Sequence, residues 1–350
     1  MFRGSNPSRL LAALLLVVPL TAVSAQGRCG GDRATTPACD TTPAKFPFAP
    51  TGWKTVALSH FTVQATDVRR EAAYYGALMN WTLRSDDGTT SILEMGNAGA
   101  VIVRGGYQAP PAPAQPAGDT SGGRAGRGNR APRRVAWDGF CFVIANWDAS
   151  TMRAALESRG LHPIADNDGK FESFHVKDPD GFDVQIANRP RLVSAGVMQA
   201  GAAAAPAPFA MTNWKTVWLD HISFEVSNYK ESAAFYMALL GWTGTGDEGS
   251  QNELVMGDAG NIIVRGGNPA TFGANRPPRR VSVGHVSFGI SPWDADGVKK
   301  ELDTRSLTGR PDTGGKGDIH TASYQSYHTT TPDGFDLQIS NATKATHTVR

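Results

Sequence analysis

LDHISFEV, residues 219–226, is the stretch that decides the fold. In a β-strand, strict alternation divides such residues between two faces. One face is a uniform apolar packing surface made of Ile222, Phe224 and Val226. The other face carries an imidazole, a hydroxyl and a carboxylate, and it consists of Leu219, His221, Ser223 and Glu225. We therefore expect a half-buried strand whose polar face lines a site.

The same pattern occurs twice more along the chain. VGHVSFGI, residues 283–290, again places a histidine, His285, opposite a continuous apolar face. LSHFTVQA, residues 58–65, places His60 in the same phase. A strand motif that recurs with its histidine in phase indicates a repeated module with a shared site.

Longer matches extend this repeat over most of the chain. GWKTVALSHFTV from Gly52 matches NWKTVWLDHISF from Asn213, and DPDGFDVQIAN from Asp178 matches TPDGFDLQISN from Thr331. All matches keep one order, so they predict two homologous domains. We place the domains at 51–190 and 211–342, with an Ala- and Pro-rich linker at 191–210. A segment rich in Pro, Gly and Arg, 107–132, is predicted to be a disordered surface insertion in the first domain.

The N-terminus has the features of a secretory signal peptide. Arg3 and Arg9 precede a short apolar run, and the small residues before Gln26 predict cleavage after Ala25. Residues 1–25 would thus direct the chain to the periplasm or out of the cell, so that the protein is secreted or periplasmic. Residues 26–50 would form a flexible tether. Cys29 and Cys39 flank a short segment that suits a small disulfide loop in an exported chain.

Composition argues against two classes of partner. Removal of the signal peptide takes away two of the 34 basic residues and none of the 32 acidic ones, which leaves a nearly neutral chain. That balance gives no reason to expect nucleic acid as a partner. No apolar run reaches the length of a membrane span. Homo-oligomer formation is left open.

Within each domain the order of a strand, a helix and several short strands occurs twice. In 211–342, for example, Asn228 is a candidate helix N-cap and Gly241 a candidate helix end. A second helix is expected after Trp293-Asp294. The predicted class is therefore α+β, with four βαβββ modules in two pairs.

The strand with an early histidine, the Pro-Asp-Gly turn and the final strand resemble the vicinal oxygen chelate superfamily. That superfamily includes glyoxalase I, extradiol ring-cleaving dioxygenases, fosfomycin-resistance enzymes and bleomycin-binding proteins. The resemblance covers both domains, and it implies that each pair of modules forms one cupped sheet. It also implies a divalent metal held on the inner faces of the first and last strands.

Carried over by position, the ligands implied by the resemblance are His221, His285 and Gln338. Gln338 lies four residues after the turn glycine, Gly334, where a glutamate is usual. A neutral amide weakens a site for a hard dication, although some glyoxalases of the superfamily use glutamine. Asp336 provides a carboxylate nearby. The alternative is that Gln338 only hydrogen-bonds the sheet edge.

Two further predictions concern the surroundings of this site. His328 with Tyr324 would have a catalytic acid/base role or orient a ligand, whereas the alternative for His328 is an ordinary surface histidine. On 261–267, where glyoxalases carry a glutamate ligand, none is found. In the first domain Gly139 stands where His285 would, so that domain is predicted to have a degenerate site.

These observations leave two hypotheses for function. The first is an exported metalloenzyme that binds a small substrate with vicinal oxygens. Iron(II) (Fe2+) would imply extradiol-type ring cleavage, while Zn2+, Mn2+ or Ni2+ would imply lyase, isomerase or transferase chemistry. The second is a metal-free protein that binds small molecules, as the bleomycin-binding relatives do.

Overall fold

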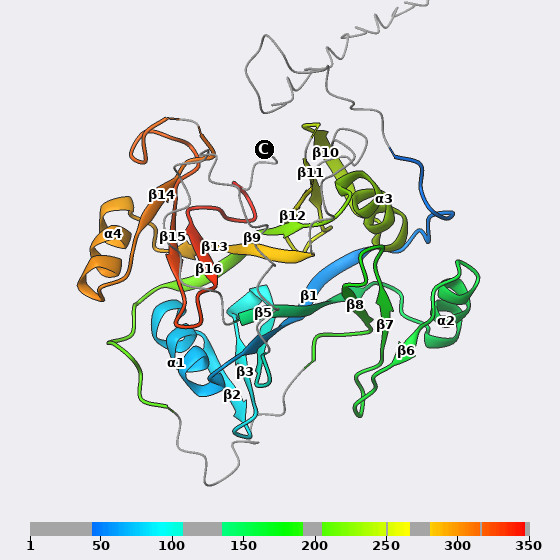
Figure 1. Cartoon of the computed structure of the whole chain (residues 1–350), viewed down its shortest axis with the longest axis horizontal. Coiled ribbons are helices and arrows are strands. Elements are labelled where there is room, and N and C mark those ends of the chain that lie inside the picture. The colour runs from blue at the N-terminus through cyan, green and yellow to red at the C-terminus, as the bar shows by residue number, and fades with distance from the viewer. Residues whose placement is uncertain are drawn as a thin grey trace, which may run out of the picture.

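In the computed structural model the chain forms two eight-stranded sheets (Figure 1). The structure describes residues 44–107, 135–191, 205–249, 251–266, 281–315 and 317–346. The predicted signal peptide, Cys29 and Cys39, residues 192–204 of the linker and all of the insertion except Tyr107 lie outside these ranges.

The first sheet has the strand order β2-β3-β4-β1-β5-β8-β7-β6. Its elements are β1 (Thr55–Ala65), α1 (Val68–Met79), β2 (Thr82–Asp86), β3 (Thr90–Glu94), η1 (Gly96–Ala98), β4 (Ala100–Arg104), β5 (Val135–Ile144), α2 (Ala149–Glu157), β6 (Ile164–Ala165), β7 (Ser173–Lys177) and β8 (Asp183–Ala187).

The second sheet repeats this arrangement as β10-β11-β12-β9-β13-β16-β15-β14. Its elements are β9 (Lys215–Glu225), α3 (Tyr229–Leu240), β10 (Thr243–Asp247), β11 (Gln251–Val255), β12 (Asn261–Arg265), β13 (Ser282–Ser291), α4 (Ala295–Thr304), β14 (Arg310–Asp312), β15 (Ser326–Thr330) and β16 (Asp336–Ser340). The predicted class, α+β with four βαβββ modules in two sheets, is confirmed.

The helices begin where short polar side chains satisfy free backbone N–H groups. Asn228 caps α3 by accepting from the backbone of Lys230, and α3 ends at Gly241 in the left-handed conformation. Asp294 caps α4 by accepting from Gly297 N–H. These are the boundaries expected from side-chain oxygens at N-caps and glycine at a helix end.

A β-bulge in β9 corrects the predicted alternation of residues 219–226. His221 pairs with Ser287 and Leu219 with Phe288, so Asp220 is the extra residue. Leu219 therefore joins the apolar core and does not share a face with His221, as the sequence had suggested. The bulge places Asp220 beside His221 on the polar face, which adds a second ionisable group to the site.

The apolar faces of the two sheets pack against each other in one core. Aromatic rings from both sheets meet there, with centroid distances of 5.6 Å between Phe140 and Phe224 and 5.5 Å between Trp137 and Phe335. Because the apolar faces of both sheets are buried in this contact, the opposite, polar faces line the insides of the two cups.

The first helix of each domain packs on its own sheet and also contacts the other domain (Figure 1). From α1, Arg70 pairs with Asp333 at 2.7 Å and the Tyr74 hydroxyl donates to the carbonyl of Thr330. From α3, the Tyr236 hydroxyl donates to Asp178 at 2.9 Å. The two domains thus contact each other through equivalent helices, α1 and α3.

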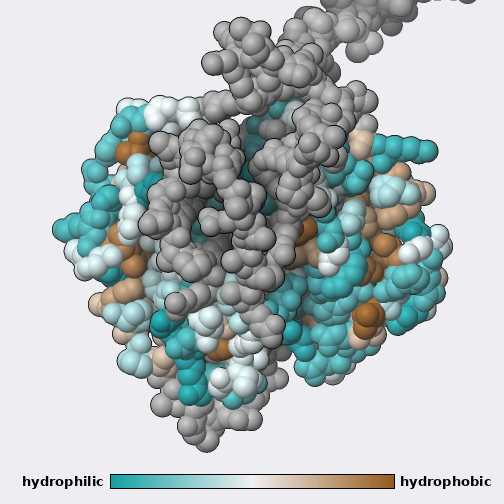
Figure 2. Space-filling view, viewed as in Figure 1, coloured by the Kyte–Doolittle hydropathy of each residue, from teal (hydrophilic) through white to brown (hydrophobic). Residues whose placement is uncertain are grey.

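On the face drawn in Figure 2, the coloured surface is mostly hydrophilic, with apolar residues scattered between polar ones. Among the described residues, no helix combines the length and the apolar character that a membrane crossing requires.

Candidate metal centre

His221 and His285 lie side by side in the second cup. They come from the two central strands of the sheet, β9 and β13, which pair antiparallel. Their Nε2 atoms are 3.0 Å apart. Two imidazole nitrogens at this separation can both ligate one ion at about 2.1 Å. The structure therefore brings together the two histidines that the sequence predicted as ligands.

Asp220 holds the ring of His221 from behind. The Nδ1 atom of His221 is 3.3 Å from Asp220 Oδ2, and the same oxygen accepts from the hydroxyls of Ser287 (2.8 Å) and Tyr324 (2.7 Å). Burial disfavours the charged carboxylate, yet His221 and these hydrogen bonds outweigh it and hold the pKa of Asp220 well below its usual range. A histidine that donates Nδ1–H to a carboxylate presents a bare Nε2, as metal ligands commonly do.

His285 is held in the uncharged form that binds metals. Burial, followed by the positive charges of His221 and His328, lowers the pKa of His285 well below its usual value. Neutral imidazole is the ligating species. The charge state of His285 therefore fits a metal centre.

Gln338 is fully buried in the middle of the sheet, between β13 and β15. Its Nε2 donates to Ser326 Oγ (2.7 Å) and to the Tyr324 hydroxyl (3.1 Å). Those two hydroxyls donate their own protons to the carbonyl of Asp312 and to Asp220, so towards Gln338 they act as acceptors. The amide nitrogen must therefore face them.

The Oε1 atom of Gln338 is left buried without a hydrogen-bond partner among the described residues. A buried acceptor without a partner is costly, and a metal ion or its bound water would satisfy it. The sheet-edge alternative does not hold, because β16 is an interior strand. The donor set of two imidazoles and one free amide oxygen fits a divalent ion.

His328 is also buried, with only 5 % of its surface exposed, so the surface-histidine alternative is wrong. Its Nδ1 is 2.7 Å from Asp336 Oδ1 and its Nε2 is 3.2 Å from Asp312 Oδ2. Burial alone would lower the pKa of His328, but the hydrogen bonds to the two aspartates outweigh it and raise that pKa. His328 is thus a proton-holding group with its ring centroid 4.9 Å from that of His285.

A second grouping with metal-ligand character overlaps the first. Ligand atoms of His285, His328 and Asp336 all lie within 4.8 Å of one another. In this grouping both ring nitrogens of His328 already contact carboxylates. Tyr324, which the sequence analysis coupled to His328, places its hydroxyl on Asp220 and Gln338.

The sequence analysis missed Asp220 and Asp312. Strict alternation assigns Asp220 to the apolar face, and only the bulge brings it into the cup. Asp312 belongs to a three-residue strand, β14, whose pairing with β15 is not evident from so short a segment. A carboxylate directly before a motif histidine was the one available signal for Asp220.

The first cup lacks the histidine pair. Gly139 occupies the position of His285, and a Cβ there would approach Asp183 oxygens at 3.2 Å. His60 is buried, and burial followed by the charges of Arg191 and Arg104 lowers its pKa to about 3. Arg191 stacks over Phe171, with its Cζ 5.2 Å from the ring centroid.

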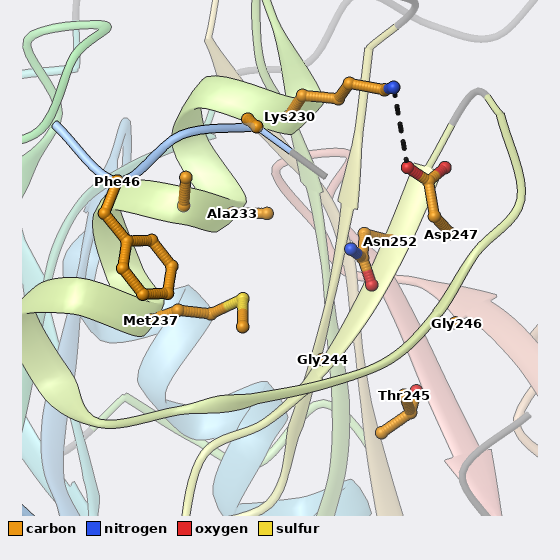
Figure 3. Close-up of a pocket in the computed structure, with 11 residues that line it drawn as sticks. Phe46, Lys230, Ala233, Met237, Gly244, Thr245, Gly246, Asp247 and Asn252 are labelled. Carbon is orange, nitrogen blue, oxygen red and sulfur yellow. Dashed lines mark ion pairs between the residues drawn. The ribbon is translucent and has the colours of Figure 1, made fainter. Parts of the chain in front are cut away.

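Two cavities lie away from the histidine pair. One, of about 440 Å³, is at the end of the first cup and includes Leu58, Ile92 and Arg191 among its lining residues. The other, of about 460 Å³, lies between α3 and the β10–β11 hairpin, where Phe46 and Met237 line it (Figure 3).

Comparisons with known structures identify the fold. A Mn(II)-bound glyoxalase from Novosphingobium aromaticivorans is similar with a TM-score of 0.55 and 16% identity, covering 82% of each chain. The 2,3-dioxygenase LapB from Pseudomonas sp. KL28 is similar with a TM-score of 0.55 and 15% identity, covering 82% of this chain and 92% of that one.

Homoprotocatechuate 2,3-dioxygenase from Brevibacterium fuscum, solved with 3,4-dihydroxyphenylacetate, is similar with a TM-score of 0.54 and 15% identity. This match covers 86% of the present chain and 84% of the dioxygenase. No protein-family model and no curated protein sequence matches the chain. The resemblance to the vicinal oxygen chelate superfamily is thus confirmed in the fold, over most of the chain.

Proposed function

We propose that this chain, which has the vicinal oxygen chelate fold, is an exported metalloenzyme acting on a small substrate with two adjacent oxygens. The ion is held by His221, His285 and Gln338 in the second cup. The observation that carries the proposal is the pair of Nε2 atoms at 3.0 Å, with the unpartnered Gln338 oxygen on the neighbouring strand. Extradiol-type ring cleavage is the proposed reaction.

The ion would polarise the substrate oxygens and lower the pKa of a hydroxyl bound to it. The chain's own residues prepare the site for this. Asp220 fixes the tautomer of His221, and Tyr324 joins Asp220 to the amide of Gln338. His328, between Asp336 and Asp312, is placed to hold or return a proton.

The comparisons support a divalent ion of this kind without specifying it. The similar structures include dioxygenases and a glyoxalase solved with Mn(II). Two histidines and one oxygen donor, with positions left for substrate and dioxygen, resemble the arrangement of non-haem iron(II) oxygenases. We therefore favour iron(II) and ring cleavage over the lyase or isomerase chemistry of a Zn2+, Mn2+ or Ni2+ site.

The test is metal analysis of the purified mature protein, followed by oxygen-uptake assays with catechols after anaerobic loading with iron(II). We expect close to one ion per chain and oxygen uptake that depends on iron. Stoichiometric Zn2+, Mn2+ or Ni2+ with no oxygen uptake would exclude the dioxygenase and leave lyase or isomerase chemistry. Absence of any bound metal, with none taken up on loading, would refute the metalloenzyme.

The alternative is a metal-free protein that binds small molecules. The cavity of about 440 Å³ in the first cup favours it, because apolar Leu58 and Ile92 line it together with charged Arg191. Calorimetric titration of the His221→Ala variant with small aromatic acids would test it. Binding unaffected by loss of the histidine would support this function.

Export is part of the same proposal. We expect Gln26 to be the N-terminal residue of the protein recovered from the periplasm or medium, by mass spectrometry of the intact chain. An intact Met1 in that fraction would contradict the signal-peptide assignment.

A further inference from the structure

Asn261 lies beside His221 in the second cup. It is the first residue of β12, and the parallel pairing of β12 with β9 sets Asn261 directly opposite His221. The side chain of Asn261 is almost completely buried, with 1 % of its surface exposed. An amide is an unusual side chain for such a position unless its polar atoms are used.

The orientation of this amide follows from its neighbour. Asn261 Nδ2 donates to Glu253 Oε1 at 3.3 Å. The nitrogen is the only donor of the amide, so it is the nitrogen that faces Glu253. Asn261 Oδ1 then has no hydrogen-bond partner among the described residues.

Gln338 has the same arrangement on the other side of the histidines. In both amides the nitrogen is held by neighbouring acceptors and the buried oxygen is free. The four side chains come from four consecutive strands, β12, β9, β13 and β16, in the order Asn261, His221, His285, Gln338. The two buried amides thus lie on the strands on either side of the histidine pair.

We propose that Asn261 Oδ1 is a further oxygen donor of the metal centre, either directly or through a bound water. The inference rests on the proposed function, since it assumes an ion on His221 and His285. Hard and borderline dications accept amide oxygens as ligands. The sequence analysis expected no ligand on 261–267, because it looked for a glutamate.

The first cup offers an internal comparison. Ala100 stands opposite His60 just as Asn261 stands opposite His221. The cup that lacks the second histidine therefore also lacks the amide. This agrees with a role of Asn261 in the site and not in the sheet.

The experiment is a titration with Mn(II), in which electron paramagnetic resonance reports the free ion. We expect Asn261→Ala to weaken binding by about tenfold, the lower end of what loss of a metal-site group costs. Asn261→Asp should instead strengthen it, because it supplies an anionic oxygen. Both variants lose the hydrogen bond to Glu253, so a purely structural role would shift their affinities in the same direction.

Asn252 provides the matched control. Its Oδ1 is also buried and without a partner among the described residues, but it lines the groove between α3 and the β10–β11 hairpin (Figure 3). Asn252→Ala should leave Mn(II) affinity unchanged. Unchanged affinity in Asn261→Ala, or equal weakening in both Asn261 variants, would overturn the inference while leaving the metalloenzyme intact. A wild-type chain that takes up no Mn(II), iron(II) or other dication would overturn both.

Discussion

The two cups have the same scaffold but different chemistry. Gln185 donates to Ser173 at 2.7 Å in the first cup, as Gln338 does to Ser326 in the second. A histidine between two aspartates also occurs in both. In the first cup it is His175, with Asp183 at 2.6 Å and Asp166 at 3.7 Å. These groups therefore do not distinguish the two cups.

The differences are concentrated around His221. Its carboxylate, Asp220, is replaced by Ser59 in the first cup, and Tyr324 is replaced by Phe171. Cys141 stands in place of Ser287 and joins a small apolar cluster with Phe171. The first cup therefore lacks the second histidine and the carboxylate beside the first; there the Ser59 hydroxyl contacts His60 Nδ1 at 3.0 Å. The second histidine and the carboxylate beside His221 are thus peculiar to the second cup, whereas the third proposed ligand, Gln338, has a counterpart in Gln185.

Arg191 completes the difference. In the first cup its guanidinium reaches Asp166 at 3.1 Å and its backbone N–H donates to the hydroxyl of Ser59. Lys344, at the matching position of the second domain, contacts Asp258 instead. A cation near His60 opposes the binding of a second cation, which is an electrostatic reason to expect no metal ion in the first cup.

The largest contrast is expected from the paired histidines. His221→Ala should abolish metal binding, since it removes one of two imidazole ligands, whereas His60→Ala should leave the bound metal nearly unchanged. Elemental analysis of both variants checks this. Equal loss of metal from both variants would show that the first cup also binds an ion.

The tyrosine difference should have the next largest effect. Tyr324→Phe removes the hydroxyl that links Asp220 to Gln338. Metal affinity should fall by about 10- to 100-fold, which is the usual loss when a residue that hydrogen-bonds to metal ligands is replaced. Phe171→Tyr should have no effect on metal content. Calorimetric titration measures both; an unchanged affinity in Tyr324→Phe would remove that residue from the site.

The equivalent glutamines of the two cups, Gln338 and Gln185, should give a smaller difference, and here the substitution should raise metal affinity. Gln338→Glu should tighten metal binding by about tenfold, because the ligand gains a negative charge in a buried position. Gln185→Glu, in the cup without the histidine pair, should acquire no metal. Comparison of the two dissociation constants checks this, and a weakened Gln338→Glu variant would argue that the glutamine is not a ligand.

The two helices that contact the other domain, α1 and α3, differ in one buried acid. Glu71 in α1 accepts from the backbone N–H of Asp333, whereas Ser232 in α3 donates to Asp180 at the matching place. Burial raises the pKa of Glu71 from 4.5 to about 7. The folded state therefore binds this proton more tightly than the unfolded state, and the stability it contributes below pH 4.5 is lost as the pH rises to 7.

Above pH 7 we expect Glu71→Gln to be more stable than the wild type by roughly 3 kcal/mol, and the gain should shrink towards pH 4.5. Urea unfolding at pH 5 and pH 8 measures this difference. Ser232→Ala should show no comparable dependence on pH. A gain in Glu71→Gln that is the same at both pH values would contradict the assignment.

The repeat and its periodicity were enough to predict the fold. Because the histidine strands recur in phase, they predict paired modules, and the apolar faces predict which side is buried. The same reasoning placed His221 and His285 on one surface, and their pairing across two central strands follows from the repeat. The ligand set as a whole, including Gln338, stays a prediction.

The sequence analysis did not predict local geometry that depends on contacts between distant parts of the chain. A bulge in β9 determines on which face of the sheet the Asp220 side chain lies. Whether a bulge forms depends on the pairing of β9 with another strand. The burial of His328 depends on Asp312, which lies 16 residues earlier on a short strand. Asn261 was overlooked because whether an amide oxygen is free to bind an ion is known only once the hydrogen bonds of that amide are known.

Because α1 and α3 each reach across to the Pro-Asp-Gly turn of the other domain, the two domains depend on each other. Neither domain carries the helix that covers its own Pro-Asp-Gly turn, so a domain expressed alone would expose the apolar surface that the other normally buries. Unfolding should then proceed in a single cooperative step, with no intermediate in which one cup survives. For the same reason, two fragments cut at the linker should restore the fold only when they are mixed. The first domain, which lacks the histidine pair, thus stabilises the fold of the domain that has it.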